Sequence, residues 1–284
     1  MKILFHFFSI NILFFFLLSG CGKDNLPEFN HLEGLRVLAF KLSAPEVSPG
    51  DTVTVTPIIS DIRATSLTYT ARVCLDPGVS YGATPSCVGN VSAVTLADQQ
   101  TLTLPGANEN WTGLADSLTV QIPASAVIFE GRSSIEQFNG VSYLLEYILS
   151  NDLGETVRSI KRIVVSDSAK TSKNSNPITA DILANGVSMT SLSWSSPVNL
   201  TTDLSLTSAE TYSSKNSSGE LGTAVEQLVT TWFVTDGETK YYRSEGLEAD
   251  EYTAPSAAPV GRSVYILAIT HDDRGGVSLV KKKF

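Results

Sequence analysis

The sequence of 284 residues predicts an all-β protein that contains two related domains. Polar and apolar residues alternate in short runs such as Thr52–Thr56, where valines occupy every second position, as in a strand with one buried face. Pro, Gly, Asn and Asp separate these runs, and long amphipathic helical patterns are scarce. A strand–turn–strand pattern from the middle of the chain recurs near its end, which indicates a duplication.

The first domain is expected over residues 35–167. A turn is expected over 45–51 and one short helix within 124–139, because Pro and Gly interrupt the strand patterns there. Val53 and Val55 should point into the core. The strands expected in this domain are Leu35–Leu42, Thr52–Thr56, Leu67–Cys74, Leu118–Ile122, Tyr143–Leu149 and Thr156–Val165.

A polar stretch, SDSAKTSKNSNP, indicates the domain boundary, and we assign 168–177 as a linker and 178–284 as the second domain. Residues 199–226 form a Ser/Thr-rich insertion for which no pattern predicts a structure. The strands expected in the second domain are Thr179–Leu183, Ser188–Trp194, Gln227–Thr235, Lys240–Ser244, Val264–His271 and Val277–Lys283.

The duplication is carried by the last hairpin of each domain. At one constant offset, the pairs that recur are Gly140 with Gly261, Leu145 with Ile266, Asp152 with Asp273, and Gly154 with Gly275. A second alignment places Ala71 on Trp232, and we expect Trp232 to lie in the core.

The first 20 residues have the features of a secretory signal. A positive start, Met1–Lys2, precedes the apolar run Ile3–Leu18, which is short for a membrane span of roughly 20 residues. The residues Leu18-Ser19-Gly20-Cys21 resemble the bacterial lipobox. The resemblance implies cleavage before Cys21 and acylation of its thiol. The alternatives are an ordinary signal peptide with a chance cysteine, or an uncleaved anchor helix.

The lipobox makes the membrane a partner, through covalent lipid at Cys21. Residues 21–34 would then form a lipidated polar tether. Each buried methylene contributes about 0.8 kcal/mol and one chain holds only marginally, so two or three chains make a lasting anchor. Gly22-Lys23 follows Cys21 directly, where an inner-membrane retention signal would have an aspartate, and this favours the outer membrane, on its periplasmic or surface face.

The charge of the chain argues against nucleic acid as a partner. Residues 1–20 contain one charged residue, Lys2, so their removal changes the net charge from −9 to −10. Phosphate backbones are bound by clustered Lys and Arg. The sequence also lacks a phosphate-binding Gly-rich loop, a His-Glu-x-x-His zinc motif and a Gly-x-Ser-x-Gly elbow. We therefore expect no cofactor, no metal and no catalytic residue.

Two cysteines remain after Cys21. Cys74 and Cys87 would lie in an oxidising compartment, where disulfides persist. Closing the Gly- and Pro-rich loop between them should contribute about 3 kcal/mol in the chain-entropy model. A redox-active pair is the alternative, but it usually has Cys-x-x-Cys spacing. We expect a structural disulfide.

The segments LSAPEVSPGDTVTVTPIISD…LTYTARVC and TTWFVTDGE…YTAP…VYILAITHDDRGGV resemble immunoglobulin-like domains of the PKD type. Those domains share a Pro/Gly opening, a Trp-bearing third strand and a closing Asp-x-x-Gly hairpin. With the lipobox, the chain also resembles two-domain lipoproteins of myxobacteria and related deltaproteobacteria. The resemblance implies two tandem Ig-like/PKD-like β-sandwich domains after a lipoprotein signal peptide. Domain one departs from the pattern, because Ala71 replaces the expected Trp. These motifs identify a core and its turns rather than a site.

Several polar and aromatic groups are candidate site residues. His271-Asp272-Asp273 is expected to form a turn, with calcium or another metal as the alternative. The acidic residues from Glu248 to Glu251 are expected to solvate a loop. Trp111 and Tyr241 are possible stacking platforms for a ligand such as a sugar ring, with packing as the alternative.

These observations predict a non-catalytic, lipid-anchored envelope protein that acts in binding or scaffolding through two Ig-like domains. Its partner would be an envelope protein or a glycan. The first alternative is a carbohydrate-binding surface module. The second, less favoured, is an enzyme with carboxylates contributed by distant segments, as in glycosidases.

Overall fold

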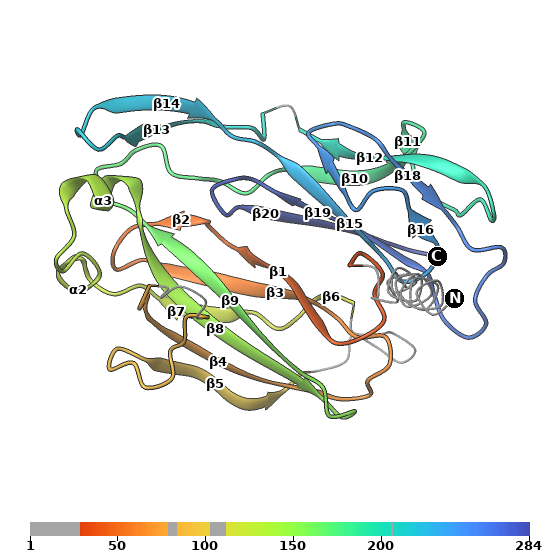
Figure 1. The fold of residues 1–284 in the computed structure, drawn as a ribbon, viewed down its shortest axis with the longest axis horizontal. Helices are drawn as coiled ribbons and strands as arrows, with labels where there is room; N and C mark the ends of the chain where they lie inside the picture. Colours follow the sequence, from red (N-terminus) through yellow and green to blue (C-terminus); the bar gives the residue numbers. More distant parts are fainter. Residues whose placement is uncertain (1–28, 79–83, 103–111, 206) are drawn as a thin grey trace, which may run out of the picture.

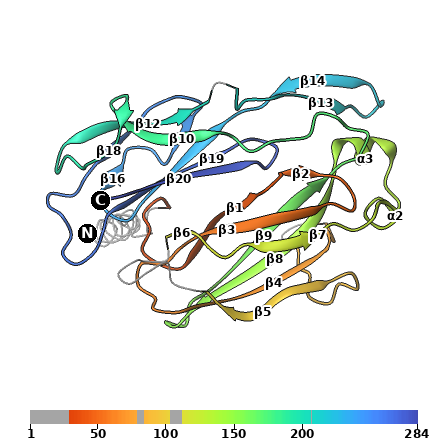
Figure 2. The ribbon, with the colours of Figure 1, turned by 180° about the vertical axis from the view of Figure 1, so that it is seen from behind.

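The computed structural model describes residues 29–78, 84–102, 112–205 and 207–284. Within these ranges the chain is built from β-strands and two short helices, which confirms the predicted all-β class. The strands form two units, each with two sheets around a buried core, and the units lie side by side (Figures 1 and 2). The predicted signal peptide, Cys21 and Trp111 lie outside the described residues.

The first unit has one small sheet and one large sheet. In the small sheet β3 (Thr52–Ser60) pairs with β1 (Arg36–Leu42) on one side and with β6 (Gly113–Leu114) and β7 (Leu118–Gln121) on the other. The order of strands in the large sheet is β2 (Glu46–Val47), β9 (Thr156–Val165), β8 (Val141–Asn151), β4 (Leu67–Leu75) and β5 (Val94–Thr101).

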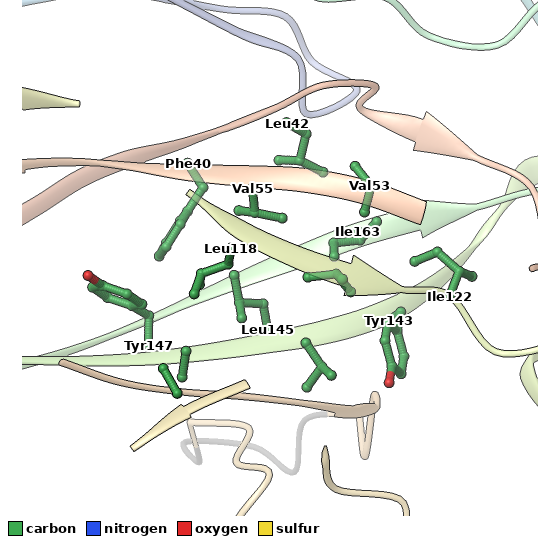
Figure 3. Packing of buried hydrophobic residues seen from close by; sticks show 14 of the residues in the cluster. Phe40, Leu42, Val53, Val55, Leu118, Ile122, Tyr143, Leu145, Tyr147 and Ile163 are labelled. Carbon is green, nitrogen blue, oxygen red and sulfur yellow. The ribbon is translucent and has the colours of Figure 1, made fainter. Parts of the chain in front are cut away.

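The core of the first unit lies between these two sheets (Figure 3). Val53 and Val55 are fully buried there, as predicted, because alternate residues of β3 face the opposite sheet. The ring of Tyr147 on β8 packs on Phe40, at 5.8 Å between centroids, and on Tyr69, at 5.2 Å. Aromatic rings of both sheets therefore meet at one level of the core.

Three features of the first unit differ from the sequence predictions. The expected turn at 45–51 contains β2, which pairs in parallel with β9, and β5 was not predicted. The single expected helix is two helices, α2 (Ser125–Ile128) and α3 (Ser134–Asn139). They are separate because Ser133 and Glu136 form a capping box that starts α3.

The second unit also has two sheets. The order in the first is β11 (Val187–Ser188), β10 (Thr179–Ala184), β12 (Pro197–Leu204), β18 (Asp250–Thr253) and β16 (Glu238–Thr239). The order in the second is β17 (Arg243–Glu245), β15 (Val229–Val234), β19 (Tyr265–His271) and β20 (Val277–Lys283). Trp232 is fully buried between them, as predicted, and its indole Nε1 donates a hydrogen bond to Ser244 Oγ at 3.0 Å.

The second unit corrects two predictions and gives the structure of the insertion, for which none was made. The expected strand Ser188–Trp194 is wrong, because only β11 pairs there and Trp194 makes a single bridge to Ala254. The strand expected at Lys240–Ser244 begins at Arg243. The insertion contains β12 and a hairpin of β13 (Thr211–Lys215) and β14 (Leu221–Val225). All residues of β14 are exposed, so no alternation of buried residues marked it.

In each unit the first strand of the repeated hairpin (β8 or β19) pairs with a neighbouring strand (β4 or β15), and one large side chain lies opposite one small side chain. The two units place the large residue on different strands of the pair. In the first unit Ala71 on β4 lies opposite Tyr147 on β8. In the second unit Trp232 on β15 lies opposite Ala268 on β19, at the corresponding positions. All four residues are fully buried. At this pair of positions each unit therefore holds one large ring opposite an alanine, with the ring supplied by β8 in one unit and by β15 in the other, which explains why Ala71 departs from the Trp pattern.

Replacing Tyr147 with Ala should lower the free energy of unfolding by about 3–5 kcal/mol, because the missing ring leaves a cavity. Adding Ala71→Trp to that variant should recover part of the loss, because an indole on the facing strand fills the same space. Urea unfolding measures both variants. Tyr241→Ala, at an exposed ring, is the control and should stay within about 0.5 kcal/mol. A double variant no more stable than Tyr147→Ala would contradict the exchange.

Candidate functional site: the domain junction and the N-terminal segment

The two units share a buried apolar junction. The face of β15 and β19 that points away from the second core packs against β1 and β3 of the first unit. Leu32, which precedes β1, lies in the same cluster and is fully buried. The other buried members of the cluster are Ile58, Phe233, Tyr265, Leu267, Ile269 and Val277.

A buried network of charges also joins the two units. The Glu46 carboxylate is 4% exposed and accepts hydrogen bonds from Lys170 Nζ at 2.7 Å and Arg274 Nη2 at 2.6 Å. Arg274 Nη1 also donates to Glu226 Oε1 at 2.9 Å. Arg274 of the second unit therefore joins Glu46 of the first unit to Glu226 of its own unit.

Burial and pairing act in opposite directions on these carboxyl groups. Burial raises the pKa of Glu46, but the hydrogen bonds from Lys170 and Ser166 and the charge of Lys170 outweigh it, and the net pKa is lowered. For Glu226 burial prevails and the pKa is raised. Glu46 is thus the carboxylate that the junction holds in its charged form.

The predicted linker, residues 168–177, is not a free hinge. Lys170 and Asn174 are buried, although their polarity predicted a solvated stretch. Asn176 connects the units, since its Nδ2 donates to Leu42 O at 2.7 Å and its Oδ1 accepts from Val277 N at 2.9 Å. Lys161 Nζ of β9 donates to Gly275 O across the same boundary at 2.7 Å. The linker therefore packs against both units, and the units also contact each other directly.

The described end of the predicted tether is also docked. Val234 N donates to Asn30 O at 2.9 Å, and Leu32 N donates to Val234 O at 2.7 Å, so residues 30–32 add a short parallel bridge to β15. The segment that precedes the first unit therefore binds the second unit. A polar tether was expected up to residue 34, and this expectation is corrected because residues 30–32 are bound to β15. They can bind there because β17 pairs only with Val229–Thr231 and leaves the end of β15 open.

Tyr241, a predicted stacking residue, is 60% exposed. The structure places two other rings in the same region. Tyr242 follows directly and is 48% exposed, and the ring of Phe29 lies 5.8 Å from the Tyr242 ring. The sequence could indicate the Tyr pair but not Phe29, because docking of residues 29–32 brings that ring to the second unit.

The carboxylates around Tyr241 have structural contacts. Asp250 is 1% exposed, and its Oδ1 accepts hydrogen bonds from the backbone N of Tyr241 at 2.9 Å and of Glu251 at 2.8 Å. Burial raises the pKa of Asp250. Asp236, also largely buried, pairs with Arg262 at 2.5 Å. Asp250 therefore fixes the backbone from which the Tyr241 ring projects, instead of solvating a loop as predicted.

The predicted disulfide between Cys74 and Cys87 is present, with Cα atoms 5.6 Å apart. Both cysteines are fully buried and pack with Leu144 on the outer face of β8. Glu146 on the same face is 1% exposed and pairs with Arg158 at 2.5 Å. The described end of the disulfide loop, residues 85–87, covers this face of the large sheet through hydrogen bonds with Glu146 and Arg158, which is a structural role.

His271 ends β19, and Asp272 and Asp273 lead into the turn that follows, where the turn was predicted. Asp272 Oδ1 accepts hydrogen bonds from the backbone N of Arg274 at 2.8 Å and of Gly276 at 2.7 Å. Burial and then the charge of Lys161 lower the pKa of His271, so the neutral imidazole is favoured. Across the described ranges no group of three His, Cys, Asp or Glu side chains is placed to hold a metal ion.

No family model matches the chain, and a search of curated proteins finds no match. Among solved structures, the chain is similar to red sea bream transglutaminase at 11% identity and a TM-score of 0.27, over 88% of this chain and 31% of that one. It is similar to the YadV chaperone at 7% identity and a TM-score of 0.25, over 87% of this chain and 100% of that one. Likenesses at this level carry no functional argument. None of the described helices is long and apolar enough to cross a bilayer.

The Glu46→Gln variant should lose about 3–5 kcal/mol of unfolding free energy at neutral pH, because Lys170 and Arg274 would stay buried without their shared anion. The pKa of Glu46 is lowered in the fold, so its contribution is complete above about pH 4.5 and is lost as pH falls through the folded pKa. The difference between variant and wild type should therefore shrink at acid pH. Urea unfolding across this range provides the measurement.

Glu155→Gln is the matched control, because Glu155 pairs with Arg63 at 2.5 Å on an exposed surface. Surface pairs are screened by water, so a much smaller loss is expected there. Equal losses of unfolding free energy in the two variants would contradict the prediction, because the buried charges at the junction would then stabilise the fold no more than an exposed ion pair.

Proposed function

We propose that the protein is a non-catalytic lipoprotein of the bacterial envelope, anchored at Cys21 and acting in binding or scaffolding through two immunoglobulin-like domains. The lipobox at Leu18–Cys21 supports the anchor, and Gly22-Lys23, in place of an aspartate directly after Cys21, supports the outer membrane. The two-sheet architecture of each unit and the repeated closing hairpin support the immunoglobulin-like assignment.

The observation that carries the proposal is the docking of the N-terminal segment and the linker onto both units. Leu32 and Asn176 each make contacts that hold the units together. In a chain whose domains are joined by flexible linkers, the N-terminal segment and the linker would both be solvated. A rigid body joined to its anchor by few residues is suited to hold a partner at a fixed place near the membrane.

A carbohydrate-binding role is the second candidate, favoured by the exposed rings of Tyr241 and Tyr242. Aromatic faces of this kind stack on apolar ligand faces while the hydroxyl groups stay in water. The dispersed-carboxylate enzyme is favoured less. The carboxylates of Asp250, Glu46 and Glu146 are each engaged in buried contacts that stabilise the fold.

The anchor is tested by replacing Cys21 with Ser in the full chain expressed in a bacterium with lipoprotein processing. The wild-type protein should fractionate with membranes, and its intact mass should begin at an acylated Cys21. The variant should appear in the soluble fraction, because the acyl chains have no thiol to join.

The Cys74→Ser/Cys87→Ser variant is the control, because it removes the other two cysteines and should keep the membrane location. A wild-type mass that begins at Met1, or that carries no acyl chains, would overturn the proposed anchor.

A further inference from the structure

Three exposed aromatic rings gather at one end of the molecule. Phe29, Tyr241 and Tyr242 are 57%, 60% and 48% exposed, and we call them the aromatic end. Phe29 stays beside the second unit through contacts of its ring with Phe233, at 5.6 Å between centroids, and with Tyr242. Three large rings left in water at one place indicate a surface with a partner.

Two basic residues flank these rings. Lys240 Nζ lies 5.6 Å from the centre of the Tyr241 ring, and Arg243 Cζ lies 5.3 Å from the centre of the Tyr242 ring. Aromatic rings with Lys or Arg beside them are typical of surfaces at the membrane–water boundary. There the rings enter the headgroup layer, the Tyr hydroxyl groups stay hydrated and the cations meet phosphate.

The aromatic end is held in place by the fold. The buried carboxylate of Asp250 fixes the backbone of Tyr241, as described above. Arg36 of β1 donates a hydrogen bond to Phe29 O, at 2.5 Å. The bridge between His31 and Val234 fixes the residues that follow Phe29. The rings are therefore presented by ordered backbone, which lowers the entropy cost of inserting them into a surface.

The position of the anchor decides which partner this surface meets. Cys21 precedes Phe29 by eight residues, which span at most about 28 Å when fully extended. A bilayer that holds the acyl chains of Cys21 is thus always within this distance of the aromatic end. The headgroup layer is roughly 7 Å deep on each side of the bilayer. Phe and Tyr side chains on the surface of the protein are long enough to reach into it.

We propose that the aromatic end rests on the bilayer that anchors Cys21, so that Phe29, Tyr241 and Tyr242 lie in the headgroup layer. This inference rests on the proposed anchor. The rings act as a second membrane contact that orients the rigid body. The β13–β14 hairpin, at the opposite end from β16, then points away from the membrane (Figures 1 and 2).

A single introduced thiol tests the orientation, because Cys21 is acylated and Cys74 is bonded to Cys87. The reporter is Glu238→Cys on β16, which leaves all three rings in place. The control reporter is Leu221→Cys on β14, at the far end. The acylated full chain is placed in vesicles of phosphatidylethanolamine and phosphatidylglycerol that contain a lipid with a nitroxide on its headgroup. A fluorophore on each thiol reports its proximity to that lipid.

We expect the fluorescence of the Glu238→Cys reporter to be quenched and that of the Leu221→Cys reporter to be unchanged. Adding Tyr241→Ser and Tyr242→Ser to the first reporter should reduce the quenching, while flotation with the vesicles and the melting temperature stay the same. Flotation with equal signals from both reporters would overturn the orientation and leave the anchor intact. A protein that does not float would overturn the anchor and, with it, this inference.

Retention on insoluble peptidoglycan distinguishes the glycan alternative. If the reporter at Glu238 is not quenched, and the Tyr241→Ser/Tyr242→Ser variant loses retention that the wild type shows, the aromatic end binds sugar. That result would also overturn the membrane contact.

Discussion

The structure depends on covering the second face of one central strand. β19 is apolar on both sides: Ile266 and Ala268 face the second core, and Tyr265, Leu267 and Ile269 face outward. Burying a side chain of this size contributes about 1.5–3 kcal/mol. β1 and β3 of the first unit provide the cover, and Leu32 completes it. The position of the first unit, the path of the linker and the docking of the N-terminal segment all follow from this requirement.

The duplicated units solve the same problem in two ways. The corresponding outward positions of β8 carry Leu144 and Glu146, and the Cys74–Cys87 disulfide with the neighbouring Ser86 covers them. The described residues of the second unit form no such disulfide-closed loop at this face, and the first unit takes its place. One copy is therefore closed by a covalent bond within itself, and the other by its neighbour. Lys161 on β9 lies opposite Leu145, on the other side of this sheet, and reaches Gly275 of the second unit, which contributes to the contact.

Features encoded in local pattern could be predicted from the sequence, and features made by distant neighbours could not. Alternation identified β3, the recurring strand–turn–strand pattern identified the two closing hairpins, and cysteine count identified the disulfide. β5 was not predicted because Ala97 is its one buried residue. β2 was not predicted because a strand of two residues is too short to show an alternating pattern. The linker was predicted to be solvated because its residues are polar, and the sequence does not reveal that Glu46 is the buried partner of Lys170. Tyr241 could be identified as an exposed ring, but Phe29 reaches this region only when the second unit binds the N-terminal segment. Asp250 acquires its role only in the folded second unit, where its carboxylate accepts a hydrogen bond from Tyr241 N.

The claim that the two units and the N-terminal segment form one rigid body is tested most directly by a distance distribution between the units. Spin labels on Val94→Cys of β5 and Val187→Cys of β11 would occupy exposed positions in the two units, and the native disulfide would stay intact. Double electron–electron resonance on the acylated full chain should give a single narrow distribution. A broad distribution, typical of two domains on a flexible linker, would contradict the account.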